Sequence, residues 1–188
     1  MSQPTGAASV SLAAVVLTGG TAVRLGGTDK ASLEYAGQPM LERVLDALVD
    51  CSEVVVAGPP TPVTRAVTFA REDPPLGGPV AGLLAGRRAL RDPVELVAVV
   101  AVDMPRLTPE TIRRLRAASA GRDGAVLVGA DGRRHLAAVL RLDRLDAATA
   151  DDDGQGLAWR RLLGELDLAE VAAVDDEGHD VDTWSDLV

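Results

Sequence analysis

The segment ELVAVVAVD, residues 95–103, is the most continuous apolar run in the chain and predicts a central strand of the fold. Almost all of its residues are aliphatic, as is typical of strands in a parallel sheet that is covered by helices. The run ends in a carboxylate, Asp103. In open α/β sheets, ligands bind beyond the carboxyl ends of the strands, so we expect Asp103 to emerge at the ligand-binding edge.

Helical patterns flank this strand on both sides. Residues 79–92, PVAGLLAGRRALRD, predict a helix in which Pro79 occupies the first turn. Residues 108–120, TPETIRRLRAASA, predict another helix, with Thr108 as its N-cap and Pro109 directly behind it. The central strand therefore alternates with helices along the chain, as strands do in successive βαβ units.

The same alternation of strand and helix extends over about the first 120 residues and indicates a parallel sheet. Further strands are predicted over 11–17, 53–58, 124–130, 134–142 and 169–175, and further helices over 39–50, 156–166 and 183–188. The DGR turn between 124–130 and 134–142 indicates a late antiparallel hairpin. We expect one α/β domain over residues 1–188, with 1–10 as a short leader.

The composition is that of a globular and acidic protein. The chain has 188 residues, of which 47% are apolar, and a net charge of −9. This charge argues against a general nucleic-acid binder or a binder of acidic membranes. An anionic ligand must therefore meet a local positive site, and we expect neither nucleic acid nor membrane as a partner.

The cysteine and histidine content limits the compartment and the metal chemistry. Cys51 is the only cysteine, which excludes a disulfide framework and indicates a reducing compartment, with the cytoplasm as the expected location. His135 and His179 are the only histidines, and we read them, like Trp159 and Trp184, as ordinary structural or surface residues. If a metal is used, it should be a hard cation held by oxygen.

A glycine-rich loop follows the first predicted strand. Gly19 and Gly20 let the backbone turn and bring its N–H groups close to phosphate oxygens, and Arg24 and Lys30 add positive charge. The loop fits neither the Walker A pattern nor the dinucleotide pattern G-x-G-x-x-G. Taken alone, it could also be a glycine-rich turn with surface charges.

Two other segments offer ligand groups at the same edge. Asp103 is a typical oxygen ligand for Mg²⁺ that also contacts nucleotide phosphates, although it could simply end a strand before a turn. Gly78 and Pro79 begin a helix, where an anion or a base edge could bind. Asp73 could accept hydrogen bonds from a base, and the reading as a plain turn residue stays equally open.

Together these segments resemble the MobA-like nucleotidyltransferases. The matching stretches occur in family order between residues 12 and 187: LTGGTAVRLGGTDKASL at 17–33, LGGPVAGL at 76–83, VAVDMPRL at 100–107 and DVDTWSDL at 180–187. The resemblance implies a Rossmann-like three-layer α/β sandwich with a mostly parallel sheet. It also implies an Mg²⁺-dependent enzyme that moves GMP from GTP to the phosphate of molybdopterin and releases pyrophosphate.

The resemblance also assigns roles to individual residues. The nucleotide would be bound by Leu17, Thr18, Gly19, Gly20, Lys30, Asp73, Gly78, Pro79 and Asp103. Arg24, Lys30 and Asp103 would be catalytic, and Asp103 would bind Mg²⁺. Proteins that deliver or accept the cofactor would be transient partners.

The chain departs from the family pattern at several positions. Thr18 replaces the usual Ala, and VVVAGPP at 54–60 lacks an Asn that often follows this strand and contacts the base or ribose. Asp182 stands where Asn is common, and it could be a second metal ligand or a cap for the terminal helix. In the segment DGRRHLAAVLR, 131–141, the family proline is missing from the part that would face the acceptor.

Three alternatives stay open from the sequence. A related enzyme could use CTP or another phosphorylated acceptor, although the Gly19–Gly20 pair favours the guanylyl branch. A signalling receiver module is also α/β with an Asp at a strand end, but this chain lacks the acid pair that a receiver needs after its first strand. A nucleotide-binding protein that has lost catalysis is the third.

Overall fold

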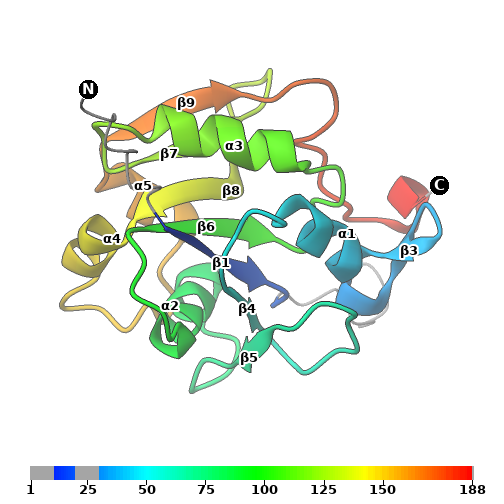
Figure 1. Ribbon diagram of the computed structural model, residues 1–188, viewed down its shortest axis with the longest axis horizontal. Helices are drawn as coiled ribbons and strands as arrows, with labels where there is room; N and C mark the ends of the chain where they lie inside the picture. The colour runs from blue at the N-terminus through cyan, green and yellow to red at the C-terminus, as the bar shows by residue number, and fades with distance from the viewer. Residues whose placement is uncertain (1–10, 20–29, 188) are drawn as a thin grey trace, which may run out of the picture.

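The computed structural model describes residues 11–19 and 30–187, which form a seven-stranded sheet with helices on both faces (Figure 1). The strand order is β5-β4-β1-β6-β8-β7-β9. The strands are β1 (Leu12–Leu17), β4 (Val54–Ala57), β5 (Thr68–Ala70), β6 (Leu96–Ala101), β7 (Gly124–Val128), β8 (Arg134–Arg141) and β9 (Leu168–Ala172). Only β8 runs against the others in this sheet, so the predicted mostly parallel sheet with a late hairpin is confirmed.

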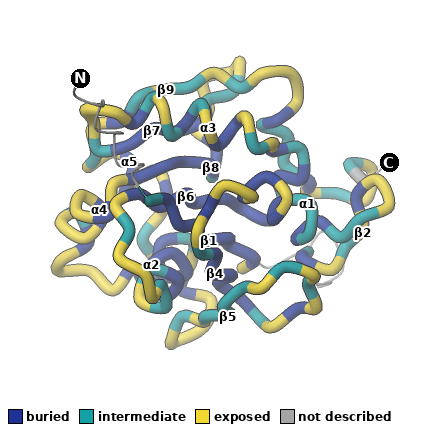
Figure 2. Tube along the Cα trace, in the orientation of Figure 1, coloured by how far each residue is buried: buried dark blue, intermediate teal, exposed yellow. Residues whose placement is uncertain are grey.

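Two helical layers complete a three-layer sandwich. The helices α1 (Met40–Ala47) and α3 (Pro109–Ala118) pack on one face, and α2 (Pro79–Ala89), α4 (Leu142–Ala148) and α5 (Trp159–Gly164) pack on the other. The central strands β1 and β6 are buried along their whole length, as the dark blue tube in Figure 2 shows. Their alternate residues supply the two cores, because successive strand side chains point to opposite faces.

The predicted helix start at residue 108 is confirmed in detail. The Thr108 side chain accepts a hydrogen bond from the Thr111 backbone N–H, and the Thr111 side chain accepts one from the Thr108 N–H. Pro109 occupies the first turn, where its missing N–H costs nothing. This reciprocal cap fixes where α3 begins after the loop that carries Asp103.

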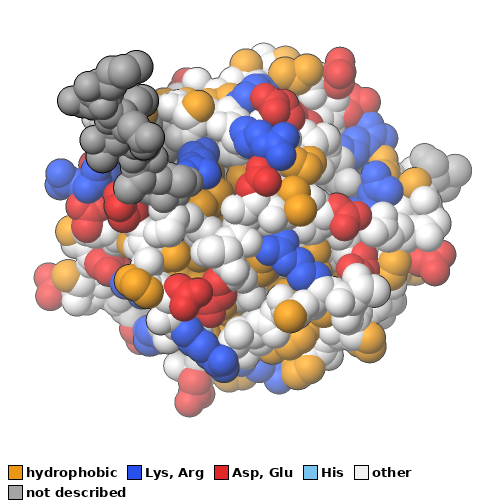
Figure 3. All heavy atoms as spheres, viewed as in Figure 1, with side chains coloured by type: hydrophobic (Ala, Val, Ile, Leu, Met, Phe, Trp, Pro, Cys, Tyr) orange, Lys and Arg blue, Asp and Glu red, His pale blue; other side chains and the backbone are white. Residues whose placement is uncertain are grey.

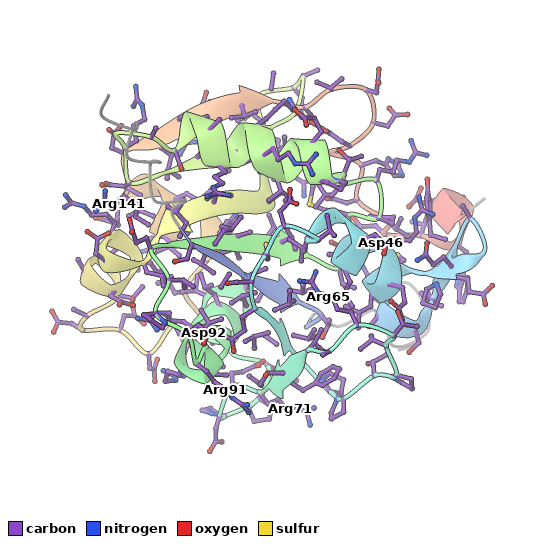
Figure 4. All side chains as sticks on the ribbon, viewed as in Figure 1. Asp46, Arg65, Arg71, Arg91, Asp92 and Arg141 are labelled. Carbon is purple, nitrogen blue, oxygen red and sulfur yellow. The ribbon has the colours of Figure 1, made fainter. Side chains whose placement is uncertain are left out.

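The end of α1 is fixed by a side chain from the following segment. Arg65, labelled in Figure 4, donates to the carbonyl of Leu48 at 2.8 Å and to that of Cys51 at 2.7 Å. These carbonyls follow the last turn of α1, where backbone acceptors lack partners within the helix. The segment between β4 and β5 is thereby tied to the helix layer.

Several element bounds differ from the sequence prediction. The central strand ends at Ala101, so Asp103 lies in the following turn rather than at the last strand residue. The helices predicted over 39–50 and 156–166 are shorter, because Pro39 belongs to a short strand and the other outer residues lie in turns or irregular segments. The elements that were not predicted are β5, α4, the small hairpin of β2 (Glu34–Tyr35) and β3 (Gln38–Pro39), and the 3₁₀ turn η2 (Lys30–Ser32).

The surface mixes charges of both signs. On the face in Figure 3, Lys and Arg side chains are interspersed with Asp and Glu side chains. Among the described residues, no helix is both long enough and apolar enough to cross a membrane. Cys51 lies in the core, where burial raises the pKa of its thiol to about 12.

Candidate functional site

The carboxyl ends of β1 and β6 meet at one edge of the sheet, on the side of the C-terminus in Figure 1. The Val102 N–H donates to the Leu17 carbonyl at 2.9 Å, which joins the two strand ends. The Val181 N–H donates to the Asp103 carbonyl at 2.8 Å and brings a distant segment to the same edge. We call residues 178–182 the C-terminal arm.

Lys30 connects the strand edge to this arm. Its ammonium donates to Asp103 Oδ2 at 3.0 Å, to the Val181 carbonyl at 3.0 Å and to Asp182 Oδ1 at 3.1 Å. Burial opposes the ammonium charge, but the Asp103 and Asp182 carboxylates more than offset this effect, so the pKa of Lys30 is raised above its ordinary value. The ammonium is therefore held fully charged at neutral pH.

Lys30 is also the only lysine in the chain, whereas eighteen positions hold arginine. An ammonium carries three N–H bonds that radiate from one atom, and here three acceptors surround that atom. The planar guanidinium of arginine spreads its donors over three nitrogens and cannot reproduce this arrangement. The site thus uses the three donors that lysine carries on a single nitrogen, which arginine does not have.

Asp103 and Asp182 fit a hard divalent cation. Both present carboxylate oxygens to the same ammonium, and their side chains are 26% and 51% exposed, which leaves oxygen atoms open to solvent. Mg²⁺ is typically bound by one or two carboxylates, with water and substrate phosphate as its other ligands. The described part of the chain holds no group of three or more His, Cys, Asp or Glu residues that could bind a metal ion.

The alternative role of Asp182 as a helix cap finds less support in the described contacts. The N–H groups of Asp182 and Thr183, which precede the terminal 3₁₀ turn η3 (Trp184–Leu187), donate to the side chain of Asp186. Asp182 Oδ1 instead accepts from Lys30. The Asp186 carboxylate thus caps this turn, whereas the Asp182 carboxylate faces the Lys30 ammonium.

A cavity of about 230 Å³ lies at the same edge. Its walls come from the strand ends (Leu17, Gly19, Ala57), the loop after β5 (Glu72, Leu76) and the start of α2 (Gly78, Pro79, Gly82). Gly78 adopts a φ of +94°, which L side chains rarely adopt, and this turn opens the helix N-terminus toward the cavity. A larger hollow of about 540 Å³ lies between α4 and α5 at the opposite edge, away from Lys30 and Asp103.

The structure thus brings most of the predicted residues to one edge. Leu17, Gly19, Gly78 and Pro79 line the cavity, and Lys30, Asp103 and Asp182 form the charged cluster. The Thr18 hydroxyl is buried and donates to the Ala57 carbonyl at 3.1 Å. Gly20 and Arg24 lie outside the described residues.

Asp73 is exposed, and its neighbour Glu72 lines the cavity instead. The sequence reading did not single out Glu72, Leu76 or the Val181 carbonyl. Glu72 directly precedes Asp73, which the sequence analysis did name. The pair of acidic residues before α2 was therefore a signal that could have pointed to Glu72 as well. A backbone carbonyl leaves no trace in a sequence.

Comparisons with known proteins find relatives over most of the chain. The sequence profile of the MobA-like NTP transferase domain matches residues 14–171. A probable molybdenum cofactor guanylyltransferase of Mycobacterium tuberculosis is 40% identical over 173 residues, covering 88% of this chain and 84% of the relative. The molybdenum cofactor guanylyltransferase of Burkholderia orbicola is 31% identical over 201 residues, covering 96% and 95%.

Solved structures share the fold at lower identity. Rv0371c of Mycobacterium tuberculosis in complex with manganese has a TM-score of 0.71 at 19% identity, with 95% of this chain and 96% of that chain covered. The molybdopterin-guanine dinucleotide biosynthesis protein A of Archaeoglobus fulgidus has a TM-score of 0.67 at 20% identity, with 93% and 94% covered. The 2-C-methyl-D-erythritol 4-phosphate cytidylyltransferase of Thermus thermophilus has a TM-score of 0.66 at 22% identity, with 94% and 95% covered.

These likenesses confirm the three-layer α/β fold. The profile covers most of the chain, and it includes residues 18–30, the start of α2 and the turn with Asp103. The receiver module considered from the sequence is thereby set aside. The profile match and the 40% identical relative show that this chain belongs to the MobA-like NTP transferase family.

Proposed function

We propose that the protein transfers GMP from GTP to the terminal phosphate of molybdopterin and releases pyrophosphate. The observation that carries this proposal is the Lys30 ammonium, which is held between Asp103 and Asp182 at the same carboxyl edge of the sheet as the cavity. A relative at 40% identity is named as a probable molybdenum cofactor guanylyltransferase, and one at 31% identity as a molybdenum cofactor guanylyltransferase. The single-domain organisation and the cytoplasmic location expected from the sequence stay predictions.

In the proposed reaction, an oxygen of the acceptor phosphate attacks the α-phosphorus of GTP, and the bond from the α-phosphorus to the bridging oxygen of pyrophosphate breaks. The attacking phosphate is already anionic at neutral pH, so the protein has to align the two groups and neutralise the leaving pyrophosphate. Lys30 supplies fixed positive charge, and the backbone N–H group of Gly19 would bind phosphate oxygens. Arg24 and Gly20 keep the roles that the resemblance implies.

A divalent cation bound by Asp103 and Asp182 would neutralise triphosphate charge. We propose Mg²⁺, because both ligands are carboxylates and the substrate supplies further oxygens. A fold neighbour was solved as a manganese complex, which is consistent with divalent-cation use in this fold. Asp103 and Asp182 also keep Lys30 charged and in position before the substrate arrives.

The cavity suits guanine. Leu17, Leu76 and Pro79 offer apolar surface against which a base can pack, and Glu72 is a half-buried carboxylate at the wall. One oxygen of Glu72 accepts from the Leu76 N–H at 3.1 Å. The carboxylate can also accept from the adjacent N1–H and N2–H donors of guanine, whereas cytosine offers a single amino donor. Asp73 stays proposed as a second contact at the rim.

CTP is the competing substrate, because a cytidylyltransferase shares the fold. The rise in melting temperature with GTP, CTP and UTP, each with Mg²⁺, separates the candidates, since a ligand that binds only the folded state stabilises it. GTP should give the largest rise. A larger rise with CTP would assign the protein to the cytidylyl branch.

Turnover is tested directly with labelled GTP, Mg²⁺ and molybdopterin, with detection of the dinucleotide and of pyrophosphate. The wild type should form both products, whereas Lys30→Ala and Asp103→Ala should remain folded and lose turnover. Asp146→Asn is the matched control, because Asp146 pairs with Arg87 on the surface away from this edge. Full activity of Asp103→Ala would contradict the assignment of the site.

A further inference from the structure

His135 is the second residue of β8, and it lies at the edge of the sheet where Asp103 emerges. Because β8 runs against β6, with Ala137 paired to Val100, the first residues of β8 lie beside the carboxyl end of β6. His135 is only 8% exposed, and its backbone carbonyl accepts from the Trp159 indole N–H at 3.1 Å. The backbone of His135 is therefore anchored on the face opposite α1 and α3.

The imidazole of His135 has an unsatisfied nitrogen. Its Nδ1 is the one buried side-chain nitrogen or oxygen in the described part of the chain that has no hydrogen-bond partner. Buried polar atoms almost always have a partner, so an exception calls for an explanation. The acidic atom that faces this nitrogen is Asp180 Oδ1, at 3.9 Å. A shift of about 1 Å would turn this approach into a hydrogen bond.

The C-terminal arm packs directly on this ring. A Cβ atom at Gly178 would lie 2.7 Å from His135 Nε2, and one at Gly129 would lie 2.8 Å from the same atom. Both positions are glycine, so the backbone on each side approaches the imidazole without a side chain between them. The ring thus forms the surface on which the arm begins.

Asp180 is the arm residue that can respond to His135. Its side chain is 17% exposed, and its Oδ2 accepts from Arg133 at 2.9 Å. Asp180 is thus held at Oδ2 by Arg133, and Oδ1 is the oxygen that faces His135 Nδ1.

Beyond Asp180, the arm supplies two of the three acceptors around Lys30. Val181 is fully buried, and its carbonyl accepts from Lys30 at 3.0 Å. Asp182 Oδ1 accepts from the same ammonium at 3.1 Å. The position of residues 178–180 therefore sets where these acceptors lie.

We propose that His135 is a positioning residue that donates from Nδ1 to Asp180 and so fixes the C-terminal arm against Lys30 and Asp103. It acts through Asp180 and need not contact the substrate. The test by enzyme activity rests on the proposed nucleotidyl transfer. The role of His135 in placing the arm does not depend on that function. Groups that orient the ligands of a reactive centre typically change activity by about 10- to 100-fold when they are removed.

Two substitutions separate the nitrogen from the shape of the ring. His135→Phe keeps a buried ring and removes the donor, whereas His135→Asn places an amide donor close to the position of Nδ1. We expect kcat to fall about tenfold or more in His135→Phe with little change in KM for GTP, and His135→Asn to recover most of the loss. Arg122→Gln, which removes a surface pair with Asp167 before the start of β7, is the control and should behave as wild type.

A second readout does not depend on catalysis. Trp184 follows the arm directly and is 56% exposed, whereas Trp159, the other tryptophan, is buried. Quenching of tryptophan fluorescence by acrylamide therefore reports mainly on the segment that follows the arm. We expect stronger quenching in His135→Phe than in wild type or His135→Asn, at a temperature where all three are folded.

The two readouts also separate this proposal from the function itself. If the wild type forms no dinucleotide but His135→Phe still shows stronger quenching, the function fails and the role of His135 stands. If His135→Phe keeps wild-type kcat and quenching, or if His135→Asn is as impaired as His135→Phe, the positioning role is wrong. In an Asp182→Asn background, the effect of His135→Phe on kcat should shrink, because an acceptor that the arm carries is already altered.

Discussion

The two sides of Lys30 are built in different ways. On one side, β1 and β6 pair in register from Leu12 with Leu96 to Leu17 with Ala101, and every residue of both strands is buried. On the other side, the C-terminal arm reaches the site through polar contacts and one buried side chain, Val181. The strand side is placed by the hydrophobic core, whereas the arm side is placed by a few directed hydrogen bonds.

The two sides should therefore tolerate amino-acid substitutions to different degrees. A strand of aliphatic residues keeps its position in the fold after many apolar substitutions, because the hydrophobic effect is not directional. A segment held by hydrogen bonds depends on the geometry of each donor and acceptor. We therefore expect the arm side to respond to changes in the shape of a charged side chain. The strand side should respond to changes in the volume of a buried side chain.

The largest effect should come from replacing Lys30 with arginine. Lys30→Arg keeps the positive charge, but its fork cannot donate from one atom to Asp103, Asp182 and the Val181 carbonyl. We expect kcat to fall about 10²- to 10³-fold, close to the loss in Lys30→Ala, with the melting temperature little changed. Steady-state kinetics beside circular dichroism melting measure both quantities.

Arg43→Lys provides the reciprocal control. Arg43 lies over the Tyr35 ring and donates to the Pro105 carbonyl, outside the Lys30 cluster, so a lysine there should leave kcat near that of wild type. If Lys30→Arg retained most of the activity, charge alone would suffice. The arm side would then not depend on the shape of the charged group, and the proposed difference between the arm side and the strand side would be wrong.

The sequence predicted the strand side well, because its signals are local. The strands β1, β4 and β6 appear in the sequence as continuous apolar runs, and Thr108 begins a recognisable capping pattern. The strand β5 was missed because it has only three residues within a proline-rich stretch. The helix α4 was missed because it begins directly where β8 ends, without a turn signal between them.

The arm side was predicted less completely, because its contacts join distant residues. Lys30 and Asp182 are 152 positions apart, and their pairing has no local signature. Asp182 was named from the family resemblance, with its role left open. His135 was read as an ordinary residue, since nothing in DGRRHLAAVLR shows that its ring lies between Gly129 and Gly178.

The second effect, of intermediate size, concerns packing on the strand side. A Cβ atom at Gly58 would lie 1.7 Å from the Thr18 hydroxyl oxygen, which cannot move without losing its bond to the Ala57 carbonyl. We expect Gly58→Ala to lower the free energy of unfolding by about 1–3 kcal/mol, as overpacking does in a filled core. Urea unfolding at neutral pH measures the change.

The double variant Thr18→Ala with Gly58→Ala tests the cause. Removing the hydroxyl makes room for the new methyl group, and the Ala57 carbonyl still accepts from the Thr18 backbone N–H at 3.2 Å. The double variant should therefore regain most of the lost stability. If the two single effects simply added, volume would not be the limiting factor on the strand side.

The smallest effect concerns the pH dependence of stability. The pKa of Lys30 is raised above the ordinary 10.5 by Asp103 and Asp182, which outweigh the opposing effect of burial. A raised lysine pKa means that the folded state retains the proton longer than the unfolded state. Its stabilising contribution is therefore complete below about pH 10.5 and is lost as the pH rises through the folded-state value.

We expect the difference in free energy of unfolding between wild type and Lys30→Met to be constant from about pH 7 to 9.5 and to decrease above pH 10.5, with a slope no steeper than about 1.4 kcal/mol per pH unit. The buried Cys51 thiol, with a pKa of about 12, also lowers stability in this range. Both proteins contain Cys51, so its contribution cancels in the difference. Because ion pairing holds the arm to Lys30, a difference that stayed constant up to pH 12 would show that the Lys30 charge contributes nothing to that attachment.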